Sequence, residues 1–268
     1  MQSTFIDAHT HIDATLQKLE YFDGFEKFRE DVIKCPQCEK FVHVACDEAS
    51  LPGGVDLMLR YQDVYGCFGI HPHNSKEYTP ELEERLVDIF RKYGETGKVL
   101  GWGEIGLDYH YDFCPRDLQK EVFIRQLKKA VELKLRIILH IREADDDALA
   151  IIREHVPKDH IIHLHCYTSD PPFAKALVEE YPNAFVGFTG VVTFKSAKGV
   201  VDSVAALPLN RILLETDAPY MAPVPFRGKT CHSGMIPSTA QKIALIKGVS
   251  VDEVYRQTRE NTRKCYGI

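Results

Sequence analysis

Short apolar runs alternate with amphipathic stretches along the 268 residues of this chain. The runs are rich in Val, Ile, Leu and Phe, which is typical of buried β-strands. The stretches between them carry apolar residues at helical spacing, most clearly over residues 115–133. The pattern predicts eight strands, which begin near Phe5, Phe41, Val64, Val99, Arg136, Ile161, Ala184 and Ile212.

Two helix starts are marked by their capping residues. Thr79, Pro80 and Glu81 have the order of an N-cap, a first-turn proline and a first-turn acid, and they predict a helix that runs to about Tyr93. Residues 250–253 have the form of a capping box and predict the last helix.

Strands that alternate with helices at this spacing indicate a parallel sheet. Eight strand–helix units favour a closed (β/α)8 TIM barrel of the α/β class, and a doubly wound open sheet is the alternative. Because no Ser/Gly-rich linker or charge block divides the chain, we predict a single domain over residues 1–268, with an irregular insertion over about residues 12–40.

Composition limits the class of protein. The hydrophobic share of 44% and the charged share of 27% are those of a globular domain and exclude a disordered chain. No apolar run approaches the ~18 residues that span a bilayer, so no membrane partner is expected. The first strand follows the N-terminus at once, which leaves no room for a targeting peptide. We therefore expect a cytoplasmic protein, with the nucleus as the alternative compartment.

The net charge of −6 does not indicate a nucleic-acid-binding surface. A site for a polyanion would need local positive charge, and bound metal ions are one source of it.

A cysteine motif near the second strand resembles a zinc knuckle. It consists of Cys35, Cys38, His43 and Cys46. The gap before the last cysteine is short, and His43 and Cys46 stand three apart on a predicted strand, so they face opposite sides. We therefore expect neither a zinc knuckle nor, without a thioredoxin-like context, a redox pair.

Acid and imidazole side chains stand where predicted strands end, which is where barrel enzymes carry their chemistry. His9 and His11 are alternate residues at the end of the first strand, so they point the same way and can converge on one cation. A carboxylate at the end of a buried strand needs a partner, either a salt bridge or a metal. The six candidate metal ligands, from five strands, are His9, His11, Glu104, His140, His165 and Asp217. This mixture of nitrogen and oxygen ligands predicts a divalent-metal centre, with two cations bridged by Glu104 favoured over one.

Four segments together resemble the TatD family of metal-dependent hydrolases, which belongs to the amidohydrolase-like superfamily of barrels. They are DAHTHID (residues 7–13), GIHPH (69–73), GEIGLDY (103–109) and ETDAPY (215–220). The resemblance extends from residue 5 to the last helix. It implies that His9, His11, Glu104 and Asp217 hold one metal, and that Glu104, His140 and His165 hold the second.

The resemblance also implies an activity, namely hydrolysis of DNA phosphodiester bonds from the 3′ end, with a single strand or a 3′ end as the partner. Two divalent ions would activate a water and clamp a phosphate, with Glu104 between them. Asp217 would be the general base, or alternatively a ligand only. The ligand types admit Mg²⁺, Zn²⁺ or Mn²⁺ and do not choose among them. We expect a monomer.

The loop after the third predicted strand offers His71, His73 and Asn74, which could grip phosphate oxygens; the family uses this segment for substrate binding. The alternative is a surface turn without a ligand. Arg142 could clamp a phosphate, or could pair with a nearby acid.

Arg227, in the loop after the eighth predicted strand, could add local positive charge or could be solvated. The next residues, 230–234, depart from the family pattern, so the substrate-side loop is expected to differ. Five aromatic residues follow strands near the expected mouth, and we expect most of them to pack under loops rather than stack on bases. They are Tyr109, Tyr111, Phe113, Tyr167 and Tyr220.

Two other functions are compatible with such a chain. The first is an ester or amide hydrolase of the same superfamily, such as a D-aminoacyl-tRNA deacylase. Amide-cleaving relatives often bridge their metals with a carboxylated lysine, so Glu104 favours the phosphoesterase. The second is a non-catalytic partner protein, whose signature would be a missing ligand, and none of the six is missing.

Overall fold

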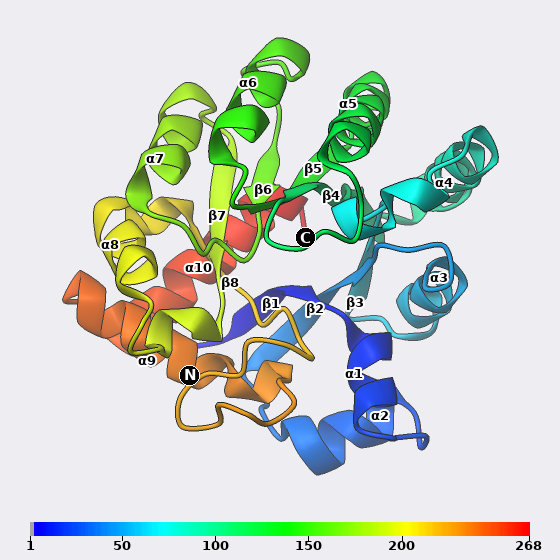
Figure 1. Ribbon diagram of the computed structural model, residues 1–268. Coiled ribbons are helices and arrows are strands. Elements are labelled where there is room, and N and C mark those ends of the chain that lie inside the picture. The colour runs from blue at the N-terminus through cyan, green and yellow to red at the C-terminus, as the bar shows by residue number, and fades with distance from the viewer. Residues whose placement is uncertain (1–2) are drawn as a thin grey trace.

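Eight parallel strands form one continuous sheet that curves into a nearly closed barrel (Figure 1). The computed structural model describes residues 3–268. Sequential strands are neighbours throughout, and β1 meets the segment after β8 where the His9 carbonyl accepts hydrogen bonds from the Thr216 and Asp217 amides at 3.3 and 3.0 Å. The predicted TIM barrel is thereby confirmed. The strands are β1 (Phe5–Thr10), β2 (Cys38–Ala45), β3 (Val64–Phe68), β4 (Val99–Asp108), β5 (Arg136–Arg142), β6 (Ile162–Leu164), β7 (Ala184–Phe188) and β8 (Ile212–Leu214).

Helices surround the sheet in Figure 1 and bury their apolar faces against it. The predicted caps are present: Thr79 Oγ1 accepts from the Leu82 amide at 3.2 Å, and Ser250 Oγ accepts from the Glu253 amide at 3.1 Å. The outer helices are α3 (Leu51–Arg60), α4 (Pro80–Tyr93), α5 (Arg116–Glu132), α6 (Asp145–His155), α7 (Pro171–Glu180), α8 (Lys198–Ala206), α9 (Ile236–Lys247) and α10 (Val251–Tyr266).

The segment expected to be an irregular insertion is largely helical, so that expectation is wrong. It contains α1 (Ile12–Lys18), α2 (Phe25–Phe28) and a short π-helix over Arg29–Ile33, and β2 begins at Cys38, inside the range expected to be irregular. Phe25 and Phe28 are buried, and the Phe25 ring packs edge-on against Phe41 of β2 at 5.2 Å. Burial of these rings, rather than a long apolar periodicity, holds the short helices in place.

The inside of the barrel is filled with side chains at its amino end. Val42, Leu100 and Leu213 form a cluster there with Tyr266 of α10. Arg136, the first residue of β5, donates from Nε to the Cys265 carbonyl at 2.7 Å. The last turn of α10 therefore closes the amino end of the barrel, and the carboxyl ends of the strands are left to form a site. Within residues 3–268, no helix has both the length and the apolar character needed to cross a bilayer.

Candidate metal centre

The two histidines of β1 point toward one place at the carboxyl end of the barrel. His9 is fully buried, and His11 is 8% exposed. His11 Nδ1 lies 2.8 Å from the Val44 carbonyl oxygen, which can only accept, so Nδ1 carries a proton and Nε2 faces the site. His9 Nε2 and His11 Nε2 lie 3.4 Å apart. Both ring nitrogens are therefore presented to the same space.

Glu104 projects into the same space from the middle of β4. The sequence predicts that the fourth strand ends at Glu104, and this is wrong, because β4 continues to Asp108. Its pairing with β5 shifts between Trp102 and Ile105, which is a bulge of the kind that re-aims a side chain. Gly103 permits the bulge, since its φ is +152° and a Cβ there would lie 2.5 Å from the Ile138 carbonyl oxygen.

The Glu104 carboxylate is surrounded by imidazole nitrogens. Its Oε1 lies 3.5 Å from His11 Nε2, and its Oε2 lies 3.8 Å from His9 Nε2. The same Oε2 lies 3.4 Å from His140 Nδ1 and in contact with His165 Nε2. Glu104 is thus central to the cluster, between the β1 histidines and the pair from β5 and β6.

Asp217 completes the cluster from the segment that follows β8. Its Oδ1 lies 3.4 Å from His11 Nε2 and 3.8 Å from His9 Nε2. Buried Asp7 holds this segment, because its carboxylate accepts from the Thr216 amide at 3.0 Å and from the Ser233 hydroxyl at 2.7 Å. The structure therefore brings all six predicted ligands together.

The donor set fits divalent cations. Ligand atoms of His9, His11 and Asp217 lie within 4.8 Å of one another, and so do those of His9, Glu104 and His165. Metal–nitrogen bonds of about 2.1 Å in a tetrahedron place neighbouring ligands about 3.4 Å apart, close to the distances observed here. Glu104 Oε2 is buried and faces ring nitrogens of His9, His140 and His165. Facing ring nitrogens around such a carboxylate are explained by a shared cation.

The contacts within the cluster also set its charges. Burial opposes ionisation of Glu104, but the His165 charge and the hydrogen bonds with His140 hold the pKa of Glu104 well below its usual value. Burial likewise opposes a charge on His11, but the hydrogen bond to Asp217 and the charge of Glu104 raise the pKa of His11 to about 10. The pKa of His9 is well below its usual value because of burial and the nearby His165. The centre therefore combines an ionised carboxylate with a neutral ligand nitrogen on His9.

Asp108, which sequence reasoning did not single out, orients one of the ligands. It is buried at the end of β4, and its Oδ2 lies 3.1 Å from both His140 Nε2 and His73 Nε2. The bond to Nε2 directs His140 Nδ1 toward Glu104, as outer partners of metal ligands do. A signal was available, because alternation along a strand puts Glu104 and Asp108 on the same face.

The structure places four of the five proposed substrate residues at one pocket and the fifth, Arg227, elsewhere. A pocket of about 570 Å³ over the metal ligands is lined by His71, His73, Asn74 and Arg142. Asn74 Nδ2 donates to Glu77 at 2.7 Å. Arg227 instead stacks its guanidinium over Phe194 at 4.3 Å and does not line this pocket.

Exposed aromatic rings stand at this pocket, so the expectation that most would pack under loops is wrong. Tyr167 is buried and Tyr109 donates to Asp147, as expected. Tyr111 and Phe113 stack on each other, with centroids 5.2 Å apart, and are 42% and 59% exposed. Tyr220 is 53% exposed.

The divergent loop lies away from the pocket. The His232 ring packs edge-on against Phe28 at 6.3 Å, and Ser233 binds Asp7. The zinc-knuckle residues do not form a common cluster: His43 Nδ1 accepts from the Ile12 amide at 3.1 Å, and within residues 3–268 no cluster of three ligating side chains includes Cys35, Cys38 or His43.

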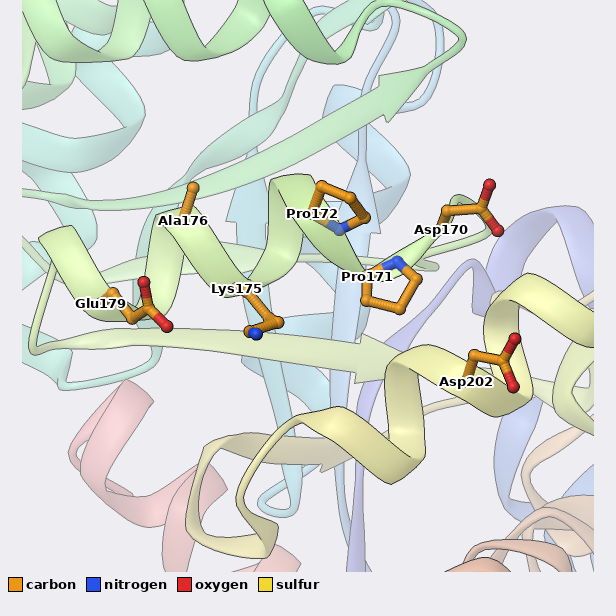
Figure 2. Close-up of a pocket in the computed structure, with 7 residues that line it drawn as sticks. All are labelled: Asp170, Pro171, Pro172, Lys175, Ala176, Glu179 and Asp202. Atoms are coloured by element: carbon orange, nitrogen blue, oxygen red, sulfur yellow. The ribbon is translucent and has the colours of Figure 1, made fainter.

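A second groove, of about 650 Å³, lies between α7 and α8 (Figure 2). It has no imidazole or thiol group, so we place the chemistry at the barrel mouth and not here. Its lining consists of Asp170, Pro171, Pro172, Lys175, Ala176, Glu179 and Asp202.

Comparison with known proteins agrees with the site. The chain matches the family described as TatD related DNase over residues 6–267. It is 35% identical over 275 residues to the human protein named 3'-5' RNA nuclease TATDN2, covering 100% of this chain and 36% of that protein. It is 33% identical to Bacillus subtilis (strain 168) YabD, named an uncharacterized metal-dependent hydrolase, covering 98% of each.

The chain thus spans little more than a third of the human relative and nearly all of the bacterial one. Its fold matches the crystal structure of YJJV, a TatD homologue from Escherichia coli K12, with a TM-score of 0.86 and 25% identity over 98% of each chain. The chain therefore belongs to the TatD family of metal-dependent hydrolases.

Proposed function

We propose that this chain is a two-metal phosphodiesterase that removes nucleotides from the 3′ end of single-stranded DNA. The observation that carries the proposal is the convergence of six ligating side chains, from five strands and the segments that follow them, around Glu104 at the floor of an open pocket. The family description names a DNase, and the human relative is named a 3'-5' RNA nuclease. RNA is therefore the comparison substrate in the test below.

His9, His11, Glu104 and Asp217 would hold one cation, and Glu104 with His140 and His165 the other; Mg²⁺, Zn²⁺ and Mn²⁺ all suit this set. When bound, such a pair lowers the pKa of water and neutralises the charge of a phosphate.

Asp217 is the general base of the proposal. It is 8% exposed and lines the pocket, so one carboxylate oxygen can accept the proton of an attacking water while the backbone bond to His9 holds the segment still. Glu104 cannot take this role as readily, because its oxygens are enclosed by imidazoles.

Substrate binding would combine charge with stacking. Arg142 lies over the Tyr111 ring at 5.1 Å, so its guanidinium is held at the pocket wall, where it can bind a phosphate. His71 and His73 would contact the same phosphate from the opposite loop, with Asn74 and Arg227 as outer contacts. The exposed ring of Phe113 would stack on a base, which is how single strands are bound without sequence preference.

Single-stranded DNA and RNA of one sequence, labelled at either end, provide the test. With Mg²⁺ or Mn²⁺ present, a 5′ label should show a ladder that shortens from the 3′ end, and a 3′ label should be released at once as a mononucleotide. Glu104→Ala and His11→Ala should lose this activity and keep the circular dichroism of the barrel. The matched control is His155→Ala, on α6 outside the ligand cluster.

Activity that survives in both ligand variants would remove the proposed centre from the reaction. If the protein cleaves the ester bond of an aminoacyl-tRNA and leaves the DNA uncut, the chain is a deacylase instead. We also propose that the enzyme is a cytoplasmic monomer. Sedimentation of the purified protein tests whether it is a monomer.

A further inference from the structure

Cys46 follows β2 directly and reaches the edge of the metal centre. A ligating nitrogen of His11, the Cys46 Sγ and a carboxylate oxygen of Glu104 lie within 4.8 Å of one another. We propose that Cys46 is a sulfur ligand of this centre, so that Zn²⁺, Cd²⁺ and Co²⁺ bind there much more tightly than the sequence-predicted nitrogen and oxygen ligands alone would allow. The inference rests on the metal centre of the proposed function and deepens it by naming the class of cation.

The backbone on both sides of Cys46 is held by hydrogen bonds. Its carbonyl accepts from the His71 amide at 2.8 Å, and the Ala45 carbonyl accepts from the Gly69 amide at 3.2 Å. Val44, two residues earlier, packs in the same interior cluster as Cys46, and its carbonyl is the group that orients His11. One short stretch of chain therefore orients the His11 ring and holds the backbone of Cys46.

A second observation at the same place indicates a ligand. Glu104 is 3% exposed, and ring nitrogens of His9, His11, His140 and His165 surround its carboxylate. A buried carboxylate is costly unless cations or protons compensate its charge, and several ring nitrogens that face one carboxylate are typical of a metal centre. The thiol, the His11 nitrogen and this carboxylate thus lie close enough together for one divalent ion to bind all three.

A sulfur ligand changes which divalent cation the centre prefers. Thiolate ligands favour Zn²⁺ and other thiophilic ions, whereas Mg²⁺ and Mn²⁺ favour oxygen. Coordination replaces the S–H bond with a sulfur–metal bond, and the proton leaves to solvent.

Cys166 shows the contrast. It follows β6 much as Cys46 follows β2, but its Sγ lies 3.6 Å from the Thr189 hydroxyl, and within the described chain it belongs to no ligand cluster.

Metal binding by the wild type, Cys46→Ser and the distant control Cys35→Ser is the test. Co²⁺-loaded wild type and Cys35→Ser should show a near-ultraviolet sulfur-to-cobalt charge-transfer band, and Cys46→Ser should lack it. Cd²⁺ affinity should fall at least about tenfold in Cys46→Ser, since loss of even an outer partner of a ligand has effects of about 10- to 100-fold. Mn²⁺ affinity should change less than about threefold.

An unchanged cobalt spectrum and Cd²⁺ affinity in Cys46→Ser would overturn the inference and leave the centre in place. If the wild type binds neither Mn²⁺ nor Co²⁺, both the inference about Cys46 and the proposed function fail. A measurement on the wild type alone covers the case of a variant that does not fold: Zn²⁺ should protect Cys46, but not Cys35, from alkylation, as read by peptide mass spectrometry. Equal labelling of Cys46 with and without Zn²⁺ also refutes the inference.

Discussion

Removal of the Asp108 side chain should weaken metal binding although Asp108 is not itself one of the six ligands. Its Oδ2 lies 3.1 Å from His140 Nε2, and this bond selects the His140 tautomer whose Nδ1 faces Glu104. A hydrogen bond to a charged partner contributes about 1.5–3 kcal/mol. Because about 1.4 kcal/mol corresponds to a factor of ten in a binding constant, Asp108→Ala should bind the metal about 10- to 100-fold more weakly.

Asp108→Asn separates the two contributions of the carboxylate. Its amide oxygen can still accept from His140 Nε2, so the tautomer is kept while the charge is lost, and we expect a loss of only a few-fold. Metal titrations of single-strand cleavage, with calorimetric metal binding alongside, provide the assay. The control is Asp112→Ala, an exposed carboxylate in the loop after β4. If Asp108→Ala binds metal as the wild type does, the orienting role of Asp108 is refuted.

Three further predictions concern substrate and proton binding. Phe113→Ala should raise KM for an oligonucleotide about 5- to 100-fold at unchanged kcat, because stacking of a base contributes about 1–3 kcal/mol; a normal KM would assign the ring to structure. Arg227→Ala should raise KM more than it lowers kcat, and since the side chain lies over Phe194 the change should be small; loss of kcat alone would contradict this. Metal affinity should rise with pH, because the pKa of His11 is raised to about 10 and that of His140 to about 9, in each case by carboxylate partners that outweigh burial. Below these values a cation must displace protons, so calorimetry at pH 7 in buffers of different ionisation enthalpy should detect the release of at least one proton per centre, and no release would contradict the assigned ligands.

The order of the barrel strands is readable from the sequence because each strand is a local apolar run and right-handed connections place sequential strands side by side. The same rule explains why His9 and Asp217, far apart along the chain, could be expected to meet. Their meeting requires only that both follow strands of one closed sheet.

The bulge at Glu104 could not be predicted in this way. It depends on how β4 pairs with β5, and on the Ile138 carbonyl that leaves room only for glycine at Gly103. Asp108 was missed because the fourth strand was expected to end before it, although alternation along a longer strand would have placed it on the face of Glu104. The helices of residues 12–33 were missed because they are too short to show a period, and packing of Phe25 and Phe28 holds them.

The placement of Tyr266 inside the barrel has a consequence for biosynthesis. Its ring shares one interior with Val42, Leu100 and Leu213, residues of strands that emerge from the ribosome much earlier. A nascent chain that has not yet reached Tyr266 therefore holds strands whose common interior is incomplete. The barrel should mature only after α10 is made, and strands waiting for that helix are the stage at which a chaperone would have most to shield.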